Sequence, residues 1–427
     1  MAERTPFPRV FWVANLIEVL ERFSYYGIYF GFGVYMTSLG YSRDQLGVVQ
    51  TIFLLLSYVI PVFSGTFADR YGFKRVLIVA YLAYLPSILL LIFTKSFSGI
   101  ALTMLSIGFA AGIFKPLISG TVRATTDRTN STLGFGIFYA MVNVGGSLGP
   151  VIAGRLRAIS WDYAFYAAAA GIIVMFFVTV FFYKEPPREI EGKSLGEKLR
   201  EIAVTLSDVK FSTFLALLGV FFWIPFWAFF NLCALYVDSN LDTAQLYRTI
   251  EGLLGTTVAD FLSREEGGVR RVMGETISHT GYIIMILQIF VAKIFEKFKA
   301  IPSFLFGLFV MACGFVVIGL AATSGASLIF PGIALFAVGE MISSPRIQEY
   351  ITWIAPKEKA GLYMGSNFLA TAVGAFSGVL YTMLYGRFAD AGTPGNVWYV
   401  LAGHLVVGIA ALLIFQRVAG GFVMQEE

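Results

Sequence analysis

Long apolar runs separated by short polar segments make up almost the whole chain of 427 residues. A helix needs about 20 consecutive apolar residues to cross a bilayer. The runs predict twelve spanning helices, at residues 9–37, 45–68, 76–94, 100–122, 133–156, 163–183, 212–236, 276–296, 302–322, 328–353, 361–385 and 396–416. The long polar segment at residues 184–211 divides them into six plus six, as expected of two repeated halves.

The pattern therefore predicts an all-α membrane protein built from two bundles. We expect an N-terminal six-helix bundle at residues 1–183, a cytoplasmic linker at 184–211 and a C-terminal six-helix bundle at 212–427. Lys and Arg are concentrated in the loops on the side of the two termini, and positively charged loops stay in the cytoplasm. We therefore expect a multi-pass protein of the cell's inner (plasma) membrane, with both termini cytoplasmic.

The composition agrees with this prediction and excludes other classes of protein. Hydrophobic residues make up 57% of the chain and charged residues 14%, whereas soluble proteins carry about 25% charged residues. The net charge of +4 is small and lies mostly in loops, so we expect no nucleic-acid partner. Without a zincin histidine pair, nucleophile elbow or phosphate-binding glycine loop, we expect no enzymatic activity, no metal and no cofactor.

A second long polar stretch, near residues 237–275, contains an amphipathic segment at 243–262. Asp242 or Thr243 can cap its start, and six apolar residues recur at helical spacing: Leu246, Ile250, Leu253, Leu254, Val258 and Phe261. We interpret the segment as an outer helix of the C-terminal bundle. It either packs on the bundle or lies at the headgroup surface, or it acts as a lid over the mouth of the molecule.

The loop after the second span reads GTFADRYGFKR, residues 65–75, and resembles the signature loop of the major facilitator superfamily. Asp69 can cap a neighbouring helix N-terminus, whose dipole favours negative charge, or pair with Arg123 at the end of the fourth span. We predict that Asp69, Arg70 and Arg123 form a latch that holds the two halves closed on the inside. A positively charged anchor alone would explain the basic residues but not Asp69.

Three charged residues, Glu18, Glu21 and Arg22, interrupt the first apolar run. One charge at the bilayer centre costs at least about 2.5–3.5 kcal/mol, so three on one helix cannot face lipid. Glu18 and Arg22 are four residues apart, share a helix face and can pair. We therefore predict that these side chains line a polar cavity between the two halves.

Two further charges lie in the middle of predicted spans, Lys115 and Glu340. The central group then holds three carboxylates against two cations. Because an unpaired buried carboxylate is costly, one of the three is expected to hold a proton. This excess predicts proton coupling, and cations on the first half with an anion on the second would fit a zwitterionic substrate. The alternative is a structural ion network through which nothing passes.

Two charged motifs lie inside predicted spans, EVLERFSYYG (18–27) and GIFKP (112–116). The first resembles the ExxER motif with its paired tyrosines, and the second the lysine motif, of the proton-dependent oligopeptide transporters, and the likeness to that family covers nearly the whole chain. FYAMVNVGGSLGP (138–150) and the pair GEMISSPRIQEYITWIAP and GLYMGSNFLA are similar to its fifth, tenth and eleventh spans. The resemblance implies the major facilitator superfamily fold, with twelve transmembrane helices in two six-helix bundles and transport by alternating access.

The resemblance also implies roles for individual residues. Glu18, Glu21, Arg22 and Glu340 would couple transport to protons. Arg22 and Lys115 would bind a substrate carboxylate, while Asn143 and Glu340 would face its amine. Other pocket residues would be Tyr25, Tyr26, Tyr58 and, in PFWAFFN (225–231), Trp227.

Four positions depart from the family pattern. Tyr29 stands where the family has a second arginine in span 1, and Asn231 where it has a glutamate in span 7. We interpret this as a coordinated loss, because dropping one partner would strand a buried charge. Asn367 replaces a pocket tryptophan, and Thr280 aligns loosely with an asparagine. We keep Tyr29, Asn231 and Asn367 among the predicted substrate-binding residues.

The sequence thus predicts a monomeric, proton-coupled symporter of small peptides or similar zwitterions, with the substrate, protons and the lipid bilayer as its partners. The departures leave an alternative open. The same fold would then carry a different cargo, such as an organic anion, a drug or a lipid, with or without the usual proton coupling. A membrane receptor or enzyme is disfavoured, because no soluble domain is appended to the spans.

Overall fold

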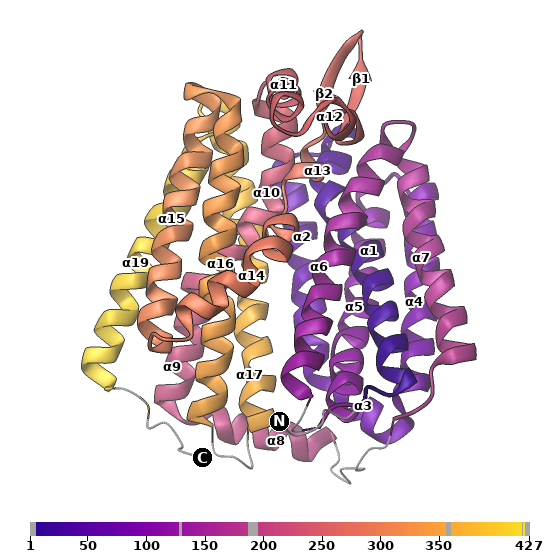
Figure 1. The fold of residues 1–427 in the computed structure, drawn as a ribbon, viewed down its shortest axis with the longest axis vertical. Helices are drawn as coiled ribbons and strands as arrows, with labels where there is room; N and C mark the ends of the chain where they lie inside the picture. The colour runs from indigo at the N-terminus through magenta and orange to yellow at the C-terminus, as the bar shows by residue number, and fades with distance from the viewer. Residues whose placement is uncertain (1–5, 128–129, 187–194, 356–359, 421, 423–427) are drawn as a thin grey trace. The chain divides into compact units, whose positions relative to one another are not determined.

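The computed structural model describes residues 6–127, 130–186, 195–355, 360–420 and 422, most of them in helices (Figure 1). The chain divides into two compact units. The first comprises Met1–Tyr41 and Ile52–Lys198, and the second Ser42–Thr51 and Leu199–Glu427. The finer division into two six-helix bundles with a linker at 184–211 stays a prediction.

The first unit is a bundle of long helices. They are α1 (Arg9–Ser38), the later part of α2 (Arg43–Val59), α3 (Pro61–Tyr71), α4 (Phe73–Phe93), α5 (Phe97–Ala124), α6 (Ser131–Arg157) and α7 (Trp161–Phe182). The predicted second span is divided between α2 and α3 at Pro61, which has no N–H to donate. Helix α8 (Leu195–Leu206) lies within the predicted linker, and its residues from Leu199 onward belong to the second unit.

Helix α1 packs closely against α6 through glycines. A Cβ atom built on Gly145 would lie 2.3 Å from the carbonyl oxygen of Val19, and one on Gly149 would lie 2.3 Å from that of Phe23. Small residues let membrane helices approach to such distances. The two glycines therefore hold the backbone of α6 against the charged turn of α1.

The second unit contains the remaining helices and a small hairpin. Its elements are α9 (Val209–Leu218), η1 (Gly219–Trp223), α10 (Ile224–Asn240), α11 (Thr243–Leu254), α12 (Thr256–Phe261), β1 (Ser263–Glu266), β2 (Val269–Val272), α13 (Gly274–Ile277), α14 (Gly281–Phe295), α15 (Ala300–Ser324), η2 (Ala326–Leu328), α16 (Ile329–Ile354), α17 (Ala360–Val373), η4 (Gly374–Phe376), η5 (Gly378–Thr382), α18 (Met383–Asp390) and α19 (Asn396–Ala419). Elements η1 and η5 are π-helical turns within the predicted seventh and eleventh spans. Such turns are frequent at functional sites.

The first residues of α2 pack as part of the second unit. Gly47 and Gly378 lie so close that a Cβ atom built on Gly47 would be 2.5 Å from the Gly378 carbonyl oxygen. The Gln50 amide donates to the carbonyl oxygen of Asn231 at 3.2 Å and accepts from the Thr382 hydroxyl at 2.7 Å. Uncharged polar contacts therefore fix this segment on η5 and α10.

Eleven helices among the described residues are long and apolar enough to cross a membrane. The remaining predicted span is α1, a 30-residue helix that carries Glu18, Glu21 and Arg22 in its interior. The prediction of an all-α membrane protein is confirmed. On which side of the membrane the termini lie stays a prediction.

The predicted outer helix at 243–262 is two helices. Asp242 caps α11, as predicted, by accepting from the backbone N–H groups of Ala244 and Gln245 at 3.0 and 3.1 Å. The prediction of one continuous helix is wrong at Gly255, which ends α11 with a φ of 86°. Glycine adopts this left-handed conformation without steric cost.

Only the first half of this segment, helix α11, packs on the second unit as the first interpretation predicts. Leu246 and Ile250 are buried, and the Thr249 hydroxyl hydrogen-bonds to that of Ser327 at 2.7 Å. Leu253, by contrast, is 76% exposed. The role of a lid stays a prediction.

A two-stranded antiparallel hairpin follows α12 and projects from the second unit (Figure 1). Its turn residues are Gly267 and Gly268, with φ values of 59° and 77°. A two-residue hairpin turn with both φ values positive selects glycine. The sequence analysis missed this element, although the Gly-Gly pair between polar β-strands was its signal.

We predict that Gly149→Ala destabilises the first unit. The added Cβ would meet the Phe23 carbonyl oxygen, which belongs to a helix backbone and cannot move aside. Overpacking of this kind costs about 1–3 kcal/mol, so the midpoint of thermal unfolding in detergent should fall. Gly136→Ala, on the same helix with nothing within 4 Å of its Cβ, should not lower it. Equal midpoints for the two variants would contradict the close α1–α6 packing.

Candidate functional site

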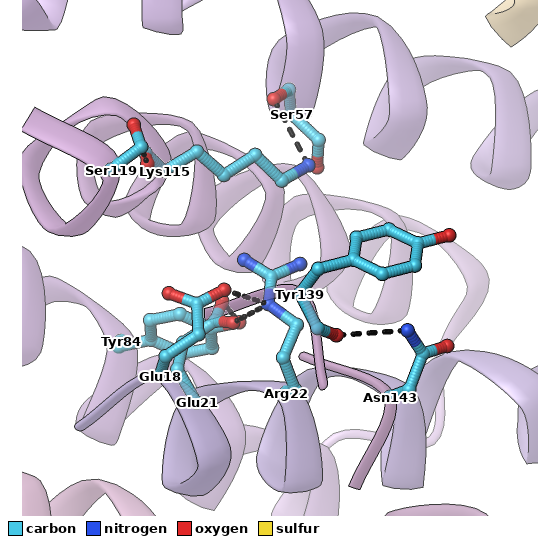
Figure 2. A network of polar contacts seen from close by, with 9 residues as sticks. All are labelled: Glu18, Glu21, Arg22, Ser57, Tyr84, Lys115, Ser119, Tyr139 and Asn143. Atoms are coloured by element: carbon cyan, nitrogen blue, oxygen red, sulfur yellow. Dashed lines mark hydrogen bonds and ion pairs between the residues drawn. The ribbon is translucent and has the colours of Figure 1, made fainter. Parts of the chain in front are cut away.

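The charged residues of α1 form one compact cluster, which Figure 2 shows from close by. Nε of Arg22 lies 2.9 Å from Oε1 of Glu18 and 2.8 Å from Oε2 of Glu21. The exposed fractions of the three residues are 6% for Arg22, 3% for Glu18 and 0% for Glu21. Two buried carboxylates therefore share one guanidinium group.

Neighbouring helices enclose this cluster. A Cβ atom on Gly145 of α6 would lie 2.7 Å from Cβ of Arg22, so α6 covers the arginine stem. From α4, the hydroxyl of Tyr84 donates to Oε1 of Glu21 at 3.2 Å. Sequence reasoning missed Tyr84, because nothing in its local sequence distinguishes it from the other tyrosines of the spans.

Lys115 of α5 has a different environment from Arg22. Its Nζ donates to the carbonyl oxygen of Ser57 at 3.2 Å and lies 3.8 Å from the ring centroid of Tyr58 and 5.0 Å from that of Tyr25. Tyrosine faces attract cations through their quadrupole. In the described part of the chain, no carboxylate forms an ion pair with this ammonium group.

The predicted tyrosines extend from this cluster along α1. The Arg22 guanidinium carbon lies 5.5 and 5.8 Å from the ring centroids of Tyr25 and Tyr26. Tyr29, one turn further, is 3% exposed and stacks on Phe53 at 5.2 Å. The structure thus brings Tyr25, Tyr26 and Tyr58 next to the two cations, whereas Tyr29 packs between aromatic rings.

Asn143 reaches towards the same region from α6. Its Nδ2 donates to the carbonyl oxygen of Tyr139 at 2.9 Å, one turn earlier on the same helix. Figure 2 shows its side chain on the Arg22 side of the cluster. The amide is half-buried, and its predicted contact with a substrate stays a prediction.

The first unit therefore balances its central charges. Glu18 and Glu21 carry two negative charges, and Arg22 and Lys115 carry two positive charges. Of these two cations, only Arg22 forms an ion pair with the carboxylates in the described part of the chain. A proton added to one carboxylate would leave the other paired with Arg22, and an anion bound at Lys115 would give that ammonium a counter-ion.

The second unit holds a single carboxylate in its predicted site. Glu340 of α16 is 8% exposed, and the hydroxyl of Thr280 lies beside its carboxyl group. No Lys or Arg of the described residues forms an ion pair with it. Thr280, which aligned only loosely with a family asparagine, is therefore a neighbour of the predicted amine-binding group.

The other predicted residues of the second unit are buried as well. Trp227 is 3% exposed and Asn367 7%. Nδ2 of Asn231 donates to the hydroxyl of Ser377 at 2.9 Å, so its side chain joins α10 to the residue that precedes η5. Substrate binding by these three residues stays a prediction.

The predicted convergence of all these groups on one chamber also stays a prediction. Glu18, Arg22 and Lys115 belong to the first unit and Glu340 to the second. The structure describes each unit by itself. Within the first unit, the grouping of the charged residues of α1 with Lys115, Tyr25 and Tyr58 is observed directly.

The predicted latch residues are placed only in part. The side chain of Asp69 lies outside the described residues, and Arg70 and Arg123 are exposed. A different acidic residue caps the next helix. Oε1 and Oε2 of Glu185 accept from the backbone N–H groups of Phe73 and Lys74, the first residues of α4, at 2.7 and 3.0 Å.

We predict that Arg22→Met destabilises the protein far more than Lys115→Met. Removing Arg22 strands two buried carboxylates, and breaking a buried ion pair costs about 3–5 kcal/mol. Removing Lys115 breaks no ion pair in the described residues. Thermal unfolding in detergent at neutral pH measures both. Equal losses would mean that Glu18 and Glu21 do not depend on Arg22.

A family model described as Major Facilitator Superfamily matches residues 14–379 of the chain. The chain is similar to the quinolone resistance protein NorA of Staphylococcus aureus (strain MRSA252), with 24% identity over 381 residues that cover 89% of this chain and 90% of NorA. It is also similar to a Na(+), Li(+), K(+)/H(+) antiporter of Planococcus maritimus. The identity there is 22% over 359 residues, which cover 78% of this chain and 80% of the antiporter.

Several solved structures have the same fold. One is a POT family transporter in complex with 5-aminolevulinic acid, with a TM-score of 0.75, 19% identity and 96% of each chain covered. Another is the nucleoside transporter NupG, with a TM-score of 0.74, 12% identity and coverage of 95% of this chain and 99% of that one. At these identities the similarity concerns the fold.

Proposed function

The chain belongs to the Major Facilitator Superfamily, and we propose that it is a proton-coupled symporter of small peptides or similar zwitterionic solutes. It would work by alternating access, as the resemblance to the proton-dependent oligopeptide transporters implies. The observation that carries the proposal is the sharing of Arg22 by Glu18 and Glu21 inside a membrane-spanning helix.

The shared guanidinium supports reversible protonation. A buried carboxylate that loses its only cation is strongly destabilised, so a proton carrier needs an arrangement that tolerates both of its charge states. With two carboxylates on one Arg22, either can take a proton while the other keeps the ion pair. The cluster can thus change its charge by one without leaving the guanidinium unpaired.

Lys115 supports the binding of a substrate carboxylate. Its ammonium group is held by a carbonyl oxygen and by tyrosine faces rather than by a carboxylate. A buried cation favours a fixed anion nearby, and a substrate carboxylate would supply it. Asn143 and Glu340 keep their proposed role at the substrate amine, with Tyr25, Tyr26 and Tyr58 beside the carboxylate.

A second candidate function is transport of a drug or another organic ion. The similarity to NorA favours it, and so do Tyr29 and Asn231, which replace a charged pair of the peptide transporters. Against it stands 5-aminolevulinic acid, the ligand of a structural relative, which carries an amine and a carboxylate like a peptide. The first experiment should therefore identify which substrate the protein transports.

We predict that a labelled dipeptide accumulates in proteoliposomes when the pH gradient drives protons in the same direction. Glu18→Gln or Glu21→Gln should lower this gradient-driven accumulation at least tenfold, because the cluster can then no longer alternate between its two charge states. Exchange of peptide without a gradient should persist. Asp162→Asn, a change at a half-exposed carboxylate of the same unit, should leave both unchanged.

If uptake by the unaltered protein does not depend on the pH gradient, the proposal of proton coupling is wrong. Accumulation of quinolones or other organic ions, with no dipeptide transport, would favour the second candidate.

We further predict that Lys115→Met raises KM at least tenfold for dipeptides with a free carboxylate. It should leave binding of the same dipeptides with an amidated C-terminus unchanged, since they carry no anion for the ammonium group. Competition against the labelled peptide measures both. Lys95→Met, at a half-exposed lysine, is the matched control. Equal losses for free and amidated peptides would show that Lys115 does not bind the carboxylate.

A further inference from the structure

The two carboxylates that share Arg22 differ in their remaining contacts. Oε1 of Glu21 accepts a hydrogen bond from the Tyr84 hydroxyl. Oε2 of Glu18 has no hydrogen-bond partner among the described residues. The two carboxylates therefore differ in their hydrogen bonds, although Oε1 of Glu18 and Oε2 of Glu21 lie at nearly equal distances from Nε of Arg22, 2.9 and 2.8 Å.

The hydrogen bond from Tyr84 distinguishes the charged from the neutral form of Glu21. An ionised carboxylate accepts from a hydroxyl, and such charge-assisted bonds are stronger than neutral ones. If Glu21 were protonated and donated to Tyr84, the tyrosine proton would need another acceptor. Tyr84 is 0% exposed, and the described residues offer its hydroxyl only Glu21.

The other groups around the cluster do not distinguish the two carboxylates in this way. Arg22 contacts both, and the ammonium group of Lys115 acts on both from α5. The titratable side chains near the cluster are Tyr25 and Tyr26 on α1, Tyr58 on α2, Tyr81 and Tyr84 on α4 and Lys115 on α5. Of the two tyrosines on α4, Tyr84 hydrogen-bonds to Glu21, whereas Tyr81 hydrogen-bonds to Thr179.

We propose that Tyr84 is a positioning residue that keeps Glu21 ionised on Arg22, so that Glu18 carries the transported proton. The proposal rests on the proposed symport. A proton from water binds Oε2 of Glu18, the Glu21–Arg22 ion pair stays intact, and the same proton later dissociates to water. No other covalent bond forms or breaks.

The first test is Tyr84→Phe in the full-length protein in proteoliposomes. Without the hydroxyl, Glu21 also becomes available to the proton, so the cluster holds it more tightly. The pH midpoint of gradient-driven uptake should therefore move upward, by about one to two pH units for the loss of one hydrogen bond to a charged group.

Tyr81→Phe is the matched control. Tyr81 lies one turn earlier on α4, is 1% exposed and hydrogen-bonds to the Thr179 hydroxyl at 3.2 Å. Its removal deletes an equally buried hydroxyl outside the cluster. The pH midpoint should stay at that of the unaltered protein, and a shift equal to that of Tyr84→Phe would overturn the proposal.

The second test needs no change at Tyr84. Infrared difference spectra across the pH midpoint should contain the carbonyl stretch of one buried protonated carboxyl group. Glu18→Gln should remove this band, and Glu21→Gln should retain it. A band that disappears only in Glu21→Gln would overturn the proposal.

The outcomes separate this proposal from the function on which it rests. If the unaltered protein shows neither gradient-driven uptake nor a titrating carboxyl band, the proposed symport itself is wrong. If both are present but Tyr84→Phe behaves as Tyr81→Phe, proton coupling survives and only the role of Tyr84 is wrong.

Discussion

The first unit depends on one interaction, the contact of a single guanidinium group with two carboxylates inside a membrane-spanning helix. Without it, α1 would carry three charges that no lipid-facing helix tolerates. The glycines of α6 bring its backbone against this turn of α1, and Tyr84 of α4 supplies a hydrogen bond. The surrounding helices therefore bury the cluster and keep it from contact with lipid.

Uncharged side chains occupy two positions at which the peptide transporters have buried charges. Asn231 stands where the peptide transporters have a glutamate, and Tyr29 of the first unit stands where they have an arginine. The Asn231 side chain hydrogen-bonds to Ser377, and Gln50 bonds to the Asn231 carbonyl oxygen. Tyr29 stacks on aromatic rings. Both side chains are satisfied within their own units, and being uncharged they strand no buried charge.

The helical spans could be predicted because a chain in lipid must satisfy its backbone hydrogen bonds internally, and apolar runs of sufficient length have no other stable form. A cap at Asp242 or Thr243 was also predictable from the sequence, because a capping side chain bonds to backbone N–H groups only two or three residues further along the chain. The prediction of one continuous helix over residues 243–262 failed at Gly255. The helical spacing of apolar residues continues past this glycine, but its left-handed backbone conformation ends the helix. It also missed the hairpin, whose strands are polar and carry no apolar alternation.

By itself, the sequence determined that Glu18 and Arg22 pair, because residues four apart on a helix share a face whatever surrounds them. It also determined that Lys115 lies in a span. Only the tertiary structure decided that Tyr84 bonds to Glu21, that Lys115 rests on Ser57 and Tyr58, and that Glu185 caps α4. Each of these contacts joins different helices or segments, and it depends on how the helices are rotated and shifted against one another. Close packing at particular glycines sets that rotation, and no local pattern of residues encodes it.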